Sequence, residues 1–167
     1  MTLCKQLSLA AALAVMACMG AAPLAATAQD MPAATAPAAP GDPGATPMTD
    51  QAVFEAFHGK EGIQRIADAT IDRSVADPRI AEVFKGIDIA KLKTHLAQQL
   101  CYVLGGGCAY TGRDMATSHK DLGVNMAEMN ALVENLQWAM DKEGVPFRAQ
   151  NKLLAKLAPM KKDVVTR

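Results

Sequence analysis

The chain has three histidines, His58, His95 and His119, and imidazole is the side chain best suited to hold a transition metal or haem iron. No two of them have the close spacing of a metal-ligand pair. The sequence has no Cys-x-x-Cys-His motif either, which excludes covalent attachment of haem in the c-type manner. His58 stands just before an expected helix, where a solvated turn residue is expected. On spacing alone, an ordinary surface or core histidine is the simpler interpretation of His119.

Four cysteines are present, and Cys4 and Cys18 fall in a segment that is expected to be cleaved. The other two, Cys101 and Cys108, would then meet in a compartment where thiols are usually oxidised. A disulfide between them would close a short loop and add about 2 to 3 kcal/mol to the free energy of unfolding, if the geometry permits. The alternative is two separate thiols, one of them packed inside a helix.

Residues 1–28 predict a cleavable secretory signal, because Lys5 is their only charge and small residues follow an apolar run. Gly20 and Pro23 interrupt that run before it reaches the roughly 20 residues that a spanning helix needs, so we expect no stable membrane span in the mature form. The protein is therefore expected to be periplasmic or secreted, with lipid anchoring through Cys18 as the alternative. Residues 29–49 are rich in Ala and Pro, which predicts a flexible linker.

Composition favours helices for the rest of the chain, residues 50–167. Half of the 167 residues are hydrophobic but only 4 % are aromatic, a balance that favours helices packed on helices over a sheet. The length suits one domain with one core. The formal net charge is zero and no dense Lys/Arg block is present, so nucleic acid is not an expected partner. We predict an all-α domain.

Apolar residues recur at three- and four-residue spacing in three long stretches, which predicts amphipathic helices at about 61–75, 89–103 and 126–143. Asp88 can cap the second, Asn125 and Glu128 have the pattern of a capping box for the third, and glycines follow both. Short helices are expected at about 78–85 and around His119. A last helix opens at 145–146, and Pro159 is expected to bend it or remove one of its hydrogen bonds.

Three motifs carry a resemblance to a known family. They are Phe-Lys-Gly-Ile-Asp-Ile-Ala-Lys-Leu-Lys at 84–93, Leu-Gly-Gly-Gly-Cys-Ala-Tyr-Thr-Gly-Arg-Asp-Met at 104–115, and His-Lys-Asp-Leu-Gly-Val at 119–124. Gly-Val-Pro at 144–146 and Leu-Ala-Pro-Met at 157–160 continue the match. Each motif is weak alone, but their order and spacing over about 115 residues resemble those of group 1 truncated haemoglobins.

That resemblance implies a truncated globin-like two-over-two helical sandwich around one non-covalent haem b per chain. His119 matches the proximal iron ligand, Phe84 the aromatic residue packed on the haem, and Lys91 a position near a propionate. Tyr110 and Met115 match the loop that frames the proximal side. The full set of implied haem-site positions is Thr70, Ile71, Phe84, Lys91, Leu92, His95, Leu96, Tyr110, Met115, His119 and Val124.

On the distal side the sequence departs from the family. Ile71 stands where members that hold oxygen tightly have a tyrosine, and Leu92 and Leu96 stand where glutamines often reach the ligand. A donor hydrogen bond to bound oxygen contributes about 1 to 3 kcal/mol when charge-assisted, so its loss does not favour oxygen storage. His95 lies at the edge of the same helix face. It is either a sixth iron ligand, as in some cyanobacterial relatives, or a solvated residue beside the haem.

These features predict a haem protein. It is expected to bind a diatomic gas (O2, NO or CO) or to cycle between ferrous and ferric iron with an electron donor. An enzymatic alternative is nitric oxide dioxygenation or peroxide turnover, which relatives perform when a donor is available. A third hypothesis is a helical adaptor that has kept the fold and lost the cofactor, motivated by the missing distal polar groups.

Overall fold

The computed structural model describes residues 41–167, so the expected signal at 1–28 and the linker up to residue 40 lie outside the described residues. Within that range every regular element is a helix, which confirms the all-α prediction. The elements are α1 (Gln51–Ala56), α2 (Gly59–Ala76), the 3-10 helix η1 (Ala81–Phe84), α3 (Ile89–Val103), α4 (Met115–His119), α5 (Met126–Lys142), α6 (Phe147–Leu157), the 3-10 helix η2 (Ala158–Met160) and α7 (Lys161–Val164).

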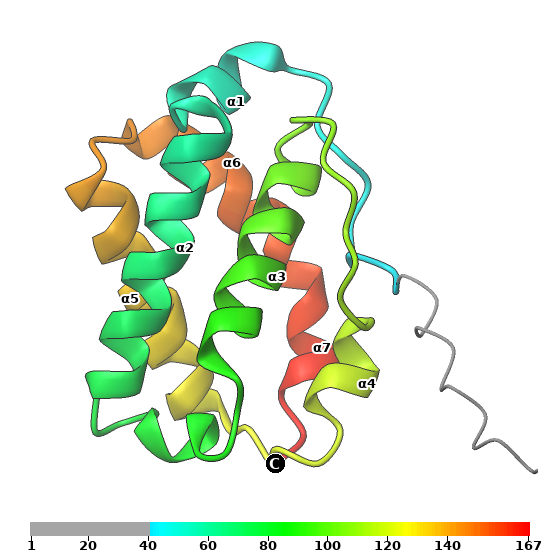
Figure 1. Cartoon of the computed structure of the whole chain (residues 1–167), viewed down its shortest axis with the longest axis vertical. Coiled ribbons are helices and arrows are strands. Elements are labelled where there is room, and N and C mark those ends of the chain that lie inside the picture. Colours follow the sequence, from blue (N-terminus) through cyan, green and yellow to red (C-terminus); the bar gives the residue numbers. More distant parts are fainter. Residues whose placement is uncertain (1–40) are drawn as a thin grey trace, which may run out of the picture. The chain divides into compact units, whose positions relative to one another are not determined.

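The long helices surround one core. Helix α2 packs against both α3 and α5, and α5 also contacts α6 (Figure 1). The apolar face that each helix turns inward follows the spacing seen in the sequence. The largest fully buried apolar side chains come from the turn before α2, from α2 and α3, and from α5 and α6: Phe57, Ile63, Ile66, Leu100, Leu104, Met140 and Leu153.

Local capping explains where the helices begin and end. The Asp88 carboxylate accepts a hydrogen bond from the backbone N–H of Lys91, 3.1 Å away, and begins α3. Asn125 and Glu128 form the capping box at the start of α5. Gly144 has a φ of 79° just after the end of α5, a conformation that side-chain-bearing residues rarely adopt. These predictions from the sequence are confirmed.

Two elements differ from the sequence expectation, and a third matches it. The short helix α1, capped by Asp50, lacks the length that periodicity needs to reveal it. The connecting helix after Asp77 is a 3-10 turn. The last helix is divided at Pro159, which lies in η2 between α6 and α7, because proline has no N–H to continue the hydrogen-bond ladder.

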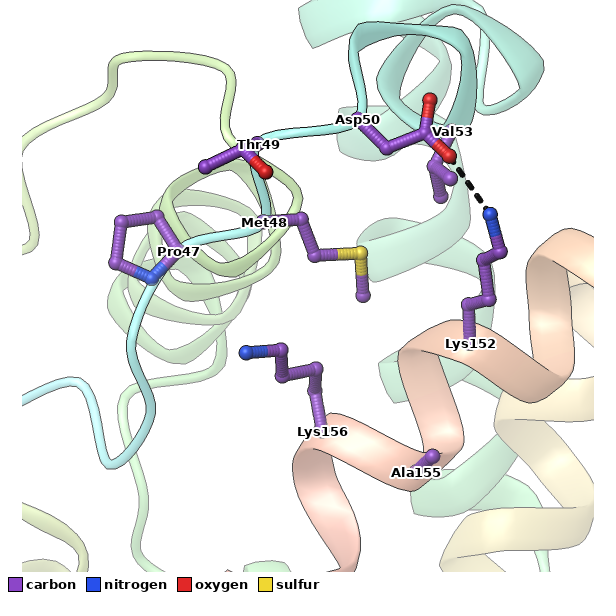
Figure 2. Close-up of a pocket in the computed structure, with 8 residues that line it drawn as sticks. All are labelled: Pro47, Met48, Thr49, Asp50, Val53, Lys152, Ala155 and Lys156. Atoms are coloured by element: carbon purple, nitrogen blue, oxygen red, sulfur yellow. Dashed lines mark hydrogen bonds and ion pairs between the residues drawn. The ribbon is translucent and has the colours of Figure 1, made fainter.

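Residues 41–48, which we call the strap, lie at the end of the segment 29–49 for which a flexible linker is expected, and in the structure they are held by hydrogen bonds. The backbone N–H of Met48 donates to the carbonyl of Val103 at 2.8 Å, and Lys156 of α6 donates to the Thr46 carbonyl at 3.2 Å. Figure 2 shows Met48 pointing into the space between this segment and α6, where Lys152 pairs with Asp50. Composition alone missed this order because the strap is held by partners far along the chain.

A disulfide joins Cys101 at the end of α3 to Cys108 in the loop that follows, with Cα atoms 5.7 Å apart. Of the two alternatives left by the sequence, the structure therefore has the covalent link. It closes the glycine-rich turn at 105–107. In residues 41–167, no helix combines the length and apolar character that crossing a membrane requires.

Candidate functional site

His119 is held in a defined tautomer at the end of α4. Its Nδ1 lies 2.8 Å from the carbonyl oxygen of Met115, one turn earlier in the same helix. A carbonyl can only accept a hydrogen bond, so Nδ1 carries the proton and donates it. The lone pair of the neutral ring is then on Nε2, which has no hydrogen-bond partner among the described residues. A backbone bond of this kind is how proteins orient a metal-ligating imidazole.

Helix α4 is short, and its position depends on its surroundings. The Asp114 carboxylate caps it by accepting from the Thr117 N–H at 2.8 Å. Helix α7 packs against it from the C-terminal end of the chain (Figure 1). The carbonyl of Val124, a buried residue, accepts hydrogen bonds from the N–H groups of Thr166 and Arg167 and so fixes the turn that follows.

Helix α3 supplies the next group of predicted site residues. Leu92, His95 and Leu96 are half-buried, whereas Lys91 is exposed in the first turn of the helix. The His95 ring stands edge-on to the ring of Tyr110, with centroids 6.3 Å apart. His95 therefore faces the loop that leads into α4, at the margin of the leucine face.

Tyr110 anchors that loop. Its side chain is buried, and its hydroxyl donates to the carbonyl of Arg113 at 2.7 Å. Burial raises the pKa of the phenol, since the charged form would lose its hydration. A side chain on Gly112 would overlap the tyrosine ring, so the loop closes tightly over it. Met115, also half-buried, opens α4 directly after this turn.

The remaining predicted positions lie on α2 and η1. Thr70 and Ile71 are buried in α2, and Phe84 is half-buried at the end of η1. The Thr70 hydroxyl donates to the Ile66 carbonyl of its own helix at 2.7 Å, so its proton is already engaged. The side chains of Ile71, Leu92 and Leu96 are apolar and carry no hydrogen-bond donor.

His58 is an exposed turn residue, as the sequence predicts, with a φ of 58° before α2. Its Nδ1 lies 3.2 Å from a carboxylate oxygen of Glu143, at the end of α5. The hydrogen bonds from Arg65, followed by that of His58, hold the pKa of Glu143 below its usual range. This cluster joins α2 to α5 and includes neither of the other histidines.

A cleft of about 470 Å³ lies elsewhere, between residues 47–53 and α6 (Figure 2). None of the predicted haem-site residues lines it. Lys152 is paired with Asp50 across it, and Lys156 donates to Thr46. Among the described residues no group of three or more His, Cys, Asp or Glu side chains could hold a metal ion.

Two buried polar residues near these elements escaped the sequence analysis. Gln99 of α3 lies at the spacing of the leucine face, three residues after Leu96, and is 7 % exposed. Asn135 of α5 is fully buried and bonds to Arg73, Ser74 and Asp77. A polar residue at an apolar position of a helix pattern is the signal that could have identified both.

The residues present fit a haem group. A haem needs one neutral imidazole for iron, apolar walls for the macrocycle and a basic or solvated edge for the propionates. His119 has the required tautomer, the predicted apolar positions Leu92, Leu96, Phe84 and Met115 are half-buried, and Lys91 is an exposed cation on the same helix as His95.

Comparisons with known proteins agree with this arrangement. The family model described as bacterial-like globin matches residues 52–166. A group 1 truncated hemoglobin of Chlamydomonas moewusii is 28 % identical over 116 residues, which are 68 % of each chain. One from Nostoc is 28 % identical over 109 residues, or 65 % of this chain and 92 % of the other.

Solved structures show the same fold. The Fe(III) form of truncated hemoglobin from Tetrahymena pyriformis has a TM-score of 0.66 at 23 % identity, covering 69 % of this chain and 98 % of that one. The 2/2 hemoglobin of Synechococcus, in the cyanomet state and with covalently attached heme, has a TM-score of 0.63 at 24 % identity over the same shares. The predicted two-over-two helical arrangement is thereby confirmed.

Proposed function

Because the chain belongs to the bacterial-like globin family, whose cofactor is haem, we propose that His119 is the axial ligand of one non-covalent haem b and that the protein binds a diatomic gas. The observation that carries this proposal is the hydrogen bond from His119 Nδ1 to the Met115 carbonyl, which leaves Nε2 as the ligating atom. When bound, haem supplies a reversible site for the gas and a ferrous–ferric couple.

The chain's own residues hold and orient the cofactor. Phe84, Met115 and Val124 provide apolar contact area, and the buried Tyr110 keeps the loop next to His119 in place. Lys91, exposed on α3, is the cation placed to meet a propionate.

The distal residues support a redox or sensing role over oxygen storage. Ile71, Leu92 and Leu96 have no polar hydrogen to donate, and the Thr70 hydroxyl donates within its own helix. Without a donor, oxygen is held weakly and the iron oxidises easily, so an external electron donor is needed to restore the ferrous form. We therefore propose that the gas is sensed, or that the iron cycles, at this site.

His95 is proposed as a second axial ligand. It is half-buried on α3, one residue before Leu96, and its ring already lies against the inward-facing loop at Tyr110. Ligation uses the lone pair of a neutral imidazole ring.

Export is also proposed. The signal pattern at 1–28 supports it, and so does the disulfide between Cys101 and Cys108, because structural disulfides are rare in reducing compartments.

Replacing His119 tests the proposal directly. We expect His119→Ala to lower haem affinity by at least about 100-fold, since the variant loses the imidazole Nε2 that is proposed to bind the iron. Haem titration of the haem-free protein, followed by the absorption band of the bound form, measures this. His58→Ala, which removes an exposed histidine, is the matched control and should bind haem as the wild type does. Unchanged colour and affinity in His119→Ala would contradict the assignment.

The sixth ligand is tested by spectroscopy. We expect the ferric protein to be low-spin, and His95→Ala to convert it to a high-spin spectrum with faster binding of added cyanide. His58→Ala again serves as the control. Identical visible spectra for the wild type and His95→Ala would show that His95 does not bind iron, while leaving the role of His119 intact.

A further inference from the structure

The strap at 41–48 precedes the part of the chain that matches the family, which begins at residue 52. It therefore lies outside the matched part of the chain. Figure 1 shows this segment, in cyan, running alongside the yellow-green loop that leads into α4. That loop carries Tyr110 and ends at the helix that bears His119.

The strap contacts the loop backbone directly. The N–H of Gly41 donates to the carbonyl of Gly112 at 2.8 Å. A Cβ atom on Gly41 would overlap the backbone of Arg113 and Asp114, so the two segments pack without an intervening side chain. Asp114 is the cap of α4, and this contact therefore lies at the point where the helix begins.

Gln99 connects the strap to the same helix from the α3 side. Its amide Nε2 donates to the Pro43 carbonyl at 2.8 Å and lies 3.4 Å from the Met115 sulfur and 3.6 Å from the Met160 sulfur. One hydrogen of the NH2 group serves the carbonyl and the other is left for the two thioethers. Met115 is the residue whose carbonyl accepts the proton of His119 Nδ1.

We propose that the strap and Gln99 together position His119, by fixing the start of α4 from two sides. Gly41 holds the backbone at 112–114, and Gln99 holds Met115 and the strap to each other. Gln99 is a positioning residue, since its contacts reach the imidazole only through Met115 and α4. This inference rests on the proposed role of His119 as the haem ligand.

The chief alternative is that the strap only adds general stability, as Met48 does by packing on the core. Local and global effects can be separated by amide hydrogen exchange in the haem-free full-length protein. Gly41→Val disturbs the contact with the loop, and Gln99→Leu removes the amide while keeping a similar volume. Gln64→Leu makes the same change at an exposed site on α2 whose side chain bonds only to Asp68, and is the matched control.

We expect Gly41→Val and Gln99→Leu each to speed exchange in peptides covering 112–119 by about three- to tenfold, with α5 unaffected, and Gln64→Leu to change neither region. Unchanged exchange at 112–119, or an equal increase in 112–119 and α5, would overturn the proposal. If Gln99→Leu does not fold, Gly41→Val alone gives the same decision.

The haem-loaded protein gives a second readout. In a His95→Ala background, which leaves one axial histidine, the iron–histidine stretching band of the ferrous protein should shift or broaden in Gly41→Val and in Gln99→Leu and stay unchanged in Gln64→Leu, because the band responds to the orientation of His119 and to its Nδ1 hydrogen bond. An unaltered band in both would also count against the positioning role. Failure of the wild type to bind haem would refute the proposed function, and the exchange comparison would still decide whether the strap orders 112–119.

Discussion

At the scale of single residues, the chemistry of the site depends on which atom of His119 carries the proton. The sequence identifies the residue through its motif, but the tautomer depends on a backbone carbonyl one helical turn away. The departures on the distal side are visible in the sequence, because Ile71, Leu92 and Leu96 are apolar wherever their side chains point. The sequence does not predict the contact between the rings of His95, on α3, and Tyr110, in the loop before α4.

Asp77 illustrates how a single carboxylate contributes to stability. It accepts from Nη2 of Arg79 at 2.8 Å and from the buried Asn135 amide at 3.2 Å, and thereby ties the end of α2 to α5. The hydrogen bonds from Arg79 are the largest cause that holds the pKa of Asp77 well below its ordinary value of 3.8. A folded-state pKa below the unfolded one stabilises the fold above about pH 4, and this is lost as the pH falls toward the folded-state value.

We therefore expect Asp77→Asn to lower the thermal midpoint by a few degrees at pH 7, and the difference from the wild type to shrink as the pH is lowered from 4 to 2. Thermal unfolding followed by circular dichroism at several pH values measures it. Asp121→Asn, at an exposed position, is the control and should have no effect at either pH. A difference of equal size at pH 7 and pH 2 would mean that the charge of Asp77 is not its cause.

At the scale of helices, the sequence predicts those helix ends that depend on residues close by in the chain. Asp88, Asn125 and Gly144 mark helix ends through their own side chains or backbone freedom, so the bounds of α3 and α5 follow from a few neighbouring residues. The short helix around His119 was also predicted, and the structure has it as α4. The 3-10 geometry of η1 was not predicted, because it depends on how the chain packs after Asp77.

The strap shows the opposite case at the same scale. Its residues have no apolar period, and their order comes from Val103, Gln99, Gly112 and Lys156, which are 55 to 110 positions away in the sequence. No local pattern could have revealed such partners. The sequence analysis therefore predicted the long helices but missed the order of the strap.

At the scale of the whole molecule, the surroundings of His119 are built from distant parts of the chain. The strap comes from the N-terminal side of the domain, α7 from its C-terminal end, and both meet the segment between α3 and α5 (Figure 1). The disulfide between Cys101 and Cys108 adds a covalent link within that segment. A short helix such as α4 has little stability of its own, so these supports determine where His119 is held.

The disulfide should stabilise the whole domain by restricting the unfolded chain. Its sequence separation of 7 corresponds to about 2 to 3 kcal/mol on the chain-entropy model. We expect the double variant Cys101→Ser/Cys108→Ser to melt about 10 °C lower than the wild type in calorimetry. A dithiol reductant should lower the wild-type midpoint to that of the double variant and leave the double variant unchanged. If the reductant exposes both thiols to labelling and the midpoint does not move, the link contributes nothing to the stability of the domain.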